Sequence, residues 1–82
     1  MRIKSYSIIL KSEPEGGYTV IVPSLPGCVT YGKTVEEAKN MAKDAIEVYV
    51  SSLEKHQESV PLEESVLFTS VNVDVSSSFS HA

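Results

Sequence analysis

The sequence predicts an α+β fold of the order β-β-β-α-β, in which one helix packs on one face of an antiparallel sheet. Three observations predict it. Segments of alternating apolar and polar side chains open the chain, one long amphipathic segment follows, and another alternating segment comes near the end. A length of 82 residues is that of one small domain. We therefore expect a single domain over residues 1–75 and a flexible, serine-rich tail over 76–82.

Three short strands are expected first. Residues 3–11 alternate, and the loop 12–17, which contains a proline and two glycines, connects them as a hairpin to a second strand over 18–22. Pro23 ends this second strand, because proline has no N–H group to donate to a neighbouring strand. A third strand over 28–31 completes an antiparallel meander.

The turn between the second and third strands has a constrained backbone. Pro23, Pro26 and Gly27 make it a rigid turn in which Leu25 is the single apolar side chain. Cys28 follows, and we expect a packed, inert thiol because no cation or helix N-terminus lies nearby in the sequence to activate it. It is the chain's single cysteine, so an internal disulfide is excluded and a reducing compartment is indicated.

A long amphipathic helix is predicted from Val35 to about Leu53. Thr34 as the N-cap residue and Glu37 three residues later form a capping box, which satisfies two backbone N–H groups at the helix start. No glycine or proline interrupts the segment. The apolar stripe expected to face the sheet consists of Val35, Ala38, Ala42, Ala45, Ile46, Tyr49 and Leu53.

A polar linker over 55–64 and a last strand over 66–75 are expected after the helix. Val71, Val73 and Val75 share one face of this strand, while the polar residues between them face solvent. A free outer edge would let these valines pair with a second copy and extend the sheet into a dimer or tetramer. We therefore expect self-association through this strand.

The net charge of −4 is unevenly distributed along the chain. Residues 1–43 carry six basic and four acidic side chains, whereas residues 44–74 carry seven acidic and one basic. Nucleic-acid-binding proteins usually present a basic patch. The acidic second half points instead to a basic protein partner, or to solubility alone. Stacking of bases on Tyr6, Tyr18 and Tyr31 of the sheet stays open as an alternative.

No pattern of a catalytic, metal-binding or cofactor-binding site is found. His56 and His81 lack partners at metal-ligand spacing, and Glu36 and Glu37 are explained as residues that stabilise the helix start. The longest uncharged stretch, 16–32, is interrupted by prolines and glycines and does not suit a membrane helix. We expect a cytoplasmic binding protein that is not an enzyme and uses no cofactor.

Residues 16–38 and 42–50 together resemble the HicB antitoxin family. The first segment joins a Leu-Pro-Gly-Cys turn to a Thr-x-Glu-Glu-Ala helix start, and the second is similar to the helical stretch of the family. The resemblance covers roughly residues 5–75. It implies a partly reduced RNase H-like domain that is not an active nuclease. It also implies a partner of the HicA type, a small basic mRNA-cleaving toxin whose active face the antitoxin covers.

The chain departs from the family pattern at two points. Ser24 and Lys33 stand where the family often has aspartate, which removes any contact that those acids make. Many family members also carry a C-terminal DNA-binding module, and this sequence ends before one. No DNA binding is therefore expected from this chain.

The resemblance and the charge distribution agree on one surface. Glu47, Glu54 and Glu58 on the helix and linker are the expected contacts to a basic toxin, because opposite charge speeds encounter and disfavours wrong partners. The alternative is an orphan, homo-oligomeric HicB-like domain with a nucleic-acid-binding or other regulatory role. A residual RNase H-like enzyme is a third hypothesis, and it would need several carboxylates around a metal ion, which the predicted strands do not carry.

Overall fold

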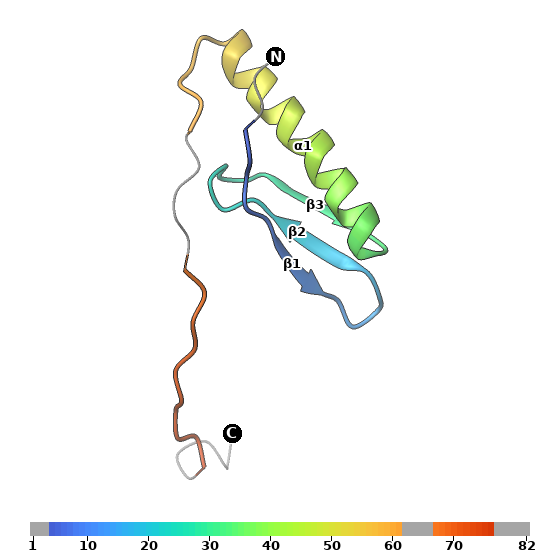
Figure 1. The fold of residues 1–82 in the computed structure, drawn as a ribbon, viewed down its shortest axis with the longest axis vertical. Helices are drawn as coiled ribbons and strands as arrows, with labels where there is room; N and C mark the ends of the chain where they lie inside the picture. Colours follow the sequence, from blue (N-terminus) through green and yellow to red (C-terminus); the bar gives the residue numbers. More distant parts are fainter. Residues whose placement is uncertain (1–3, 62–66, 77–82) are drawn as a thin grey trace.

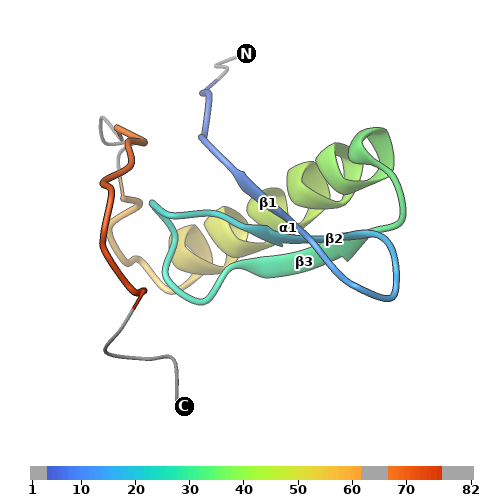
Figure 2. The ribbon, with the colours of Figure 1, turned by 90° about the horizontal axis from the view of Figure 1, so that it is seen from below.

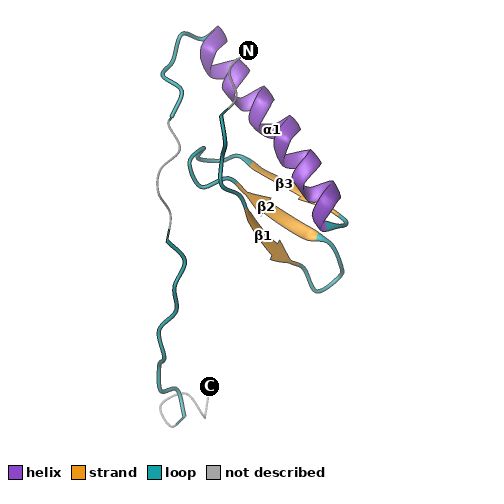
Figure 3. Cartoon of the chain, viewed as in Figure 1, coloured by secondary structure: helices purple, strands orange, loops and turns teal. Residues whose placement is uncertain are grey.

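The computed structural model describes residues 4–61 and 67–76 (Figure 1). These residues contain β1 (Ile9–Ser12), β2 (Tyr18–Ile21), β3 (Val29–Gly32) and α1 (Val35–Lys55). The strands form one antiparallel sheet in the order β1-β2-β3, and α1 lies across one face of it (Figure 2, Figure 3). This arrangement confirms the predicted α+β fold and the first four elements of the predicted order.

β1 is much shorter than the predicted strand over 3–11. Ile9 pairs with Ile21, which is the last residue of β2. Pro23 follows two residues later and has no N–H group to continue the pairing. Residues 4–8 therefore precede the sheet as an unpaired extension, while β2, β3 and α1 begin and end within two residues of their predicted bounds.

The register of the sheet decides which side chains face the helix. Val20 pairs with Thr30, and the Val20 side chain is fully buried beneath α1. The next row, which joins Ile9, Ile21 and Val29, points to the opposite face because successive side chains alternate. α1 leaves that face uncovered (Figure 2), and Val29 is accordingly 57% exposed.

The core beneath α1 consists of two adjoining clusters of buried apolar side chains. The first contains Val20, Ala38 and Ala42, against which Ile8, Leu10 and Tyr18 pack. The second contains Val22, Leu25 and Cys28, against which Tyr6, Ile8, Ala45, Ile46, Tyr49 and Val50 pack. Most of the predicted helix stripe therefore faces the core. The two ends of the stripe are the exceptions: Val35 is exposed, and Leu53 is half-buried but belongs to neither cluster.

The start of α1 carries the predicted Thr34 N-cap, but the Glu37 side chain bonds one residue earlier than the predicted capping box requires. The Glu37 N–H donates to Thr34 Oγ1 at 3.0 Å. The Glu37 carboxylate in turn accepts a hydrogen bond of 3.1 Å from the Lys33 N–H, one residue before the cap. These two hydrogen bonds fix the point at which the chain turns from β3 into α1.

Replacing Thr34 with alanine is expected to lower the free energy of unfolding by about 1 kcal/mol, because the Glu37 N–H loses its acceptor. Urea unfolding followed by circular dichroism measures this change. Thr34→Ser is the matched control, since it keeps the acceptor oxygen and should cost little. An equal loss in both variants would contradict the capping role.

The predicted last strand is not formed in the described part of the chain. Residues 67–75 are extended, pair with no strand and lead away from the sheet (Figure 1, Figure 3). The predicted strand failed because an alternating pattern indicates which side chains share a face but supplies no partner for the backbone. Val66 and the tail over 77–82 lie outside the described residues.

Candidate functional site

A groove of about 870 Å³ runs between the segment that leads into β1 and the flank of α1. α1 contacts β3 most and β2 less. The side of the helix that faces β1 is therefore not covered by the sheet. The groove is lined by residues of both elements: Lys4, Tyr6, Ile8, Lys39, Ala42, Lys43, Ile46, Glu47, Val50, Ser51 and Glu54.

The groove has an apolar floor and a charged rim. Ile8, Ile46 and Val50 are half-buried and form part of the floor. The charged α1 side chains that line the groove are ordered along the helix, with Lys39 and Lys43 nearer its N-terminus and Glu47 and Glu54 nearer its C-terminus. The apolar floor suits a protein side chain, and the acidic end of the rim suits a basic partner.

Two of the three predicted acidic contacts lie together on this rim. Glu47 and Glu54 are two helical turns apart on α1, and both are exposed. Glu58 is also exposed but lies beyond the helix end, outside the groove. The acidic surface therefore extends from the groove past the end of α1.

The end of α1 fixes where Glu58 lies. The Glu58 N–H donates to the Leu53 carbonyl at 2.8 Å, and the Gln57 N–H donates to the Glu54 carbonyl at 3.1 Å. Gln57 has a φ of 58°. This is the Schellman arrangement, which usually has glycine at the position of Gln57. The absence of glycine there explains why the sequence did not reveal this helix end.

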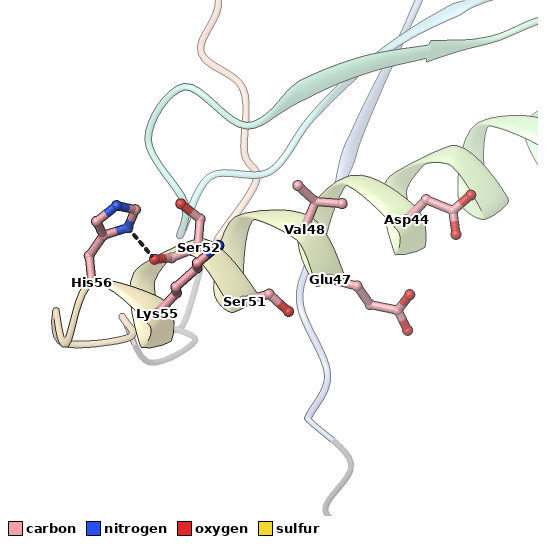
Figure 4. Close-up of a pocket in the computed structure, with 7 residues that line it drawn as sticks. All are labelled: Asp44, Glu47, Val48, Ser51, Ser52, Lys55 and His56. Atoms are coloured by element: carbon pink, nitrogen blue, oxygen red, sulfur yellow. Dashed lines mark hydrogen bonds between the residues drawn. The ribbon is translucent and has the colours of Figure 1, made fainter.

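Glu47 also borders a shallow depression on the outer side of α1 (Figure 4). Its lining residues are Asp44, Glu47, Val48, Ser51, Ser52, Lys55 and His56. The His56 Nδ1 atom lies 2.8 Å from the Ser52 carbonyl oxygen. Figure 4 shows the Asp44 and Glu47 carboxylates directed away from the helix, so they are available to a partner.

The Pro23–Cys28 turn inserts Leu25 and Cys28 into the core, while Pro26 and Gly27 at its tip are exposed. Leu25 is fully buried, and its backbone bonds to both ends of the turn: its N–H donates to Val22 and its carbonyl accepts from Cys28. The Tyr49 hydroxyl donates to the Pro26 carbonyl at 2.8 Å. Together these contacts attach the turn to α1.

The environment of Cys28 does not favour a reactive thiol. Its side chain is 5% exposed, and burial raises the pKa of the thiol above its ordinary value. The thiolate is the nucleophilic form, so this residue is held in its unreactive, protonated state near neutral pH. Its contacts with Val22 and Leu25 give it a packing role.

The three strand tyrosines do not form one stacking platform. Tyr18 packs against the core on the helix side of the sheet, and Tyr6 packs against the second core cluster. Tyr31 pairs with Thr19 on the opposite face, and its hydroxyl donates to the Gly16 carbonyl at 2.8 Å. This placement weakens the base-stacking alternative, which needs aromatic rings on a shared open face.

Within residues 4–61 and 67–76, no three His, Cys, Asp or Glu side chains gather closely enough to hold a metal ion. His81 lies outside those residues. The described part of the chain also contains no helix that is both long and apolar enough to cross a membrane.

Comparison with protein families gives one match over nearly the whole chain. Residues 6–79 match the profile of a family described as the HicB-like antitoxin of bacterial toxin–antitoxin systems. The match contains all three strands, α1 and the extended segment 67–76.

Individual relatives include UPF0150 proteins and HicB antitoxins. A UPF0150 protein of Thermoplasma acidophilum is 48% identical over 56 residues, which cover 68% of this chain and 81% of that protein. A UPF0150 protein of Synechocystis is 38% identical over 66 residues, covering 80% of this chain and 84% of that protein. Antitoxin HicB of Escherichia coli K12 is 39% identical over 57 residues, which cover 70% of this chain but 41% of that longer protein.

The family match and the structure support the same interpretation. The matched region has the predicted strand order, the capped helix and the buried turn, and it presents an acidic rim beside an apolar groove. By its sequence, the chain belongs to the HicB-like antitoxin family of bacterial toxin–antitoxin systems.

Proposed function

We propose that this chain neutralises a small basic, RNA-cleaving toxin of the HicA type by binding it and covering its active face. The observation that carries this proposal is the family match over residues 6–79, because it places nearly the whole chain in an antitoxin family. In this function the RNase H-like domain that the resemblance implies serves as a binding scaffold and not as a nuclease.

The acidic end of α1 supplies a binding surface of the right charge. Glu47, Glu54 and Glu58 are exposed, and the first two lie on the rim of the groove. Carboxylates at the rim of an interface attract a basic partner from a distance and orient it.

Replacing these three glutamates with glutamine is expected to weaken toxin binding about tenfold, since each exposed charge pair contributes a fraction of a kcal/mol up to about 1 kcal/mol. The effect should appear mainly as slower association and should shrink as salt is added. The measurement is the inhibition of RNA cleavage by a purified toxin as the chain is titrated, at low and at moderate salt.

Glu15→Gln with Glu36→Gln is the control. Both residues are exposed and lie in the β1–β2 loop and at the start of α1, away from the acidic end of the helix. Unchanged inhibition by the triple variant would refute the assignment of this surface. Failure of the unaltered chain to inhibit the toxin would refute the proposed function itself.

An orphan domain is the second candidate function. It is favoured by the exposed apolar residues of the extended segment, which point to self-association whether or not a toxin is bound. The −4 net charge and the separate placement of the tyrosines do not favour nucleic acid as its ligand. An orphan domain would inhibit no toxin but would still assemble.

A further inference from the structure

We propose that residues 67–75 of one copy of the chain pair with β1 of a second copy as a fourth strand, and that their valines fill the groove between β1 and α1. The exchange is reciprocal, so two copies form a closed two-fold dimer. This dimer does not depend on toxin binding and would form equally in an orphan domain.

The segment 67–75 has the pattern of a strand but has no partner within the described chain. Val71, Val73 and Val75 are 80%, 73% and 56% exposed. They share one side of an extended backbone, while the residues between them are polar. Leaving such an apolar row in water is unfavourable, so the row indicates a surface that is buried on assembly.

The free edge of β1 is the place where a fourth strand fits. β1 is at the end of the sheet order β1-β2-β3, so its outer backbone groups have no strand partner among the described residues. β3 is the other edge, but the groove has no lining residue from β3. The groove opens beside β1, and its wall includes Tyr6 and Ile8 just before that strand.

The spacing of the groove floor matches that of the valines. Side chains two residues apart on a strand are separated by about 7 Å. Side chains four residues apart on a helix are separated by about 6 Å along its axis. A strand beside β1 would therefore set two successive valines against Ile46 and Val50, the half-buried apolar residues that α1 contributes to the groove.

The course of the chain favours a second copy as the donor of the strand. The Tyr6 hydroxyl donates to the Pro61 carbonyl at 3.3 Å, which brings the chain back to the groove after α1. Residues 67–76 then run away from their own sheet (Figure 1). The radius of gyration is 16.9 Å, against about 12 Å for a compact chain of this length. A two-fold exchange covers the valine row of each copy and the β1 edge of each copy at the same time.

The test is the mass of the chain by light scattering at micromolar concentration, together with nuclear Overhauser contacts in a mixture of differently labelled copies. We expect a dimer, with contacts between Val73 of one copy and Ile46 of the other. Replacing Val71, Val73 and Val75 with threonine keeps β-branched side chains but removes their apolar surface. It should weaken the dimer by about a hundredfold or more.

The control is Ser70→Thr with Asn72→Thr, which alters the polar side of the same segment and should leave the dimer intact. Three outcomes would overturn the exchange. One is a monomer in which Val73 contacts Ile46 of its own chain. The second is a monomer without such contacts. The third is a dimer that survives the triple threonine substitution, since it would be held by another surface.

Discussion

Replacing Leu25 with alanine is expected to lower the free energy of unfolding by about 2–5 kcal/mol, because it leaves a cavity in the core. Leu25 is fully buried and is the largest such side chain in the described core. It belongs to the core cluster with Val22 and Cys28, against which side chains from the C-terminal half of α1 pack. In so small a core, few neighbouring side chains are available to fill the space.

Urea unfolding at a fixed protein concentration measures this loss. Val48→Ala is the control, because Val48 is aliphatic but 70% exposed on α1 and its truncation should change stability by less than about 0.5 kcal/mol. A cost below 1 kcal/mol for Leu25→Ala would mean that the turn does not anchor the helix to the sheet.

Gly32→Ala is expected to cost about 1–3 kcal/mol or more, through a clash rather than a cavity. A Cβ atom at Gly32 would lie 2.3 Å from the backbone nitrogen of Ala38 and 2.4 Å from its Cα atom. These are backbone atoms of the first turns of α1, so no side-chain rotation relieves the contact. Either β3 or the start of α1 has to move.

The position of the clash gives this prediction a local readout. The Ala38 N–H donates to the Thr34 carbonyl at 2.8 Å, next to the atoms that would collide. Hydrogen exchange at Ala38 should therefore become faster in Gly32→Ala than the global loss of stability requires. Ser12→Ala, at the exposed end of β1, is the control and should leave this exchange unchanged. Unaltered exchange at Ala38 would contradict the close approach of α1 and β3.

Local signals explain why much of the fold is predictable from the sequence. Thr34 and Glu37 mark the helix start through hydrogen bonds within one turn, and the helical spacing of Ala38 and Ala42 identifies the buried side. The hairpin loop is equally local, since Gly16 and Gly17 adopt the positive φ values that favour glycine. None of these features depends on distant parts of the chain.

The remaining features depend on contacts that are distant in sequence. The length of β1 is limited by where β2 ends, and an alternating pattern such as that of residues 67–75 forms a strand only where a sheet edge is available to it. The groove exists because the segment before β1 meets the flank of α1, and no local pattern indicates that meeting. The sequence predicted which glutamates form the acidic surface. It did not indicate that Glu47 and Glu54 lie on the rim of one groove.

The two proposed surfaces are compatible. A strand from a second copy would occupy the apolar floor of the groove, while Glu47 and Glu54 on the rim of α1 would stay at its edge. Glu58 lies outside the groove and would be unaffected. A dimer would then present two acidic surfaces related by the two-fold axis, each able to receive one basic partner.

Toxin neutralisation is tested most directly by expressing the tagged chain in its own source cells and identifying what co-purifies at moderate salt. We predict recovery of a small basic protein in stoichiometric amount, which cleaves RNA once it is separated from the chain. Recovery of the tagged chain alone, as a stable homo-oligomer without such a protein, would contradict toxin neutralisation as its function.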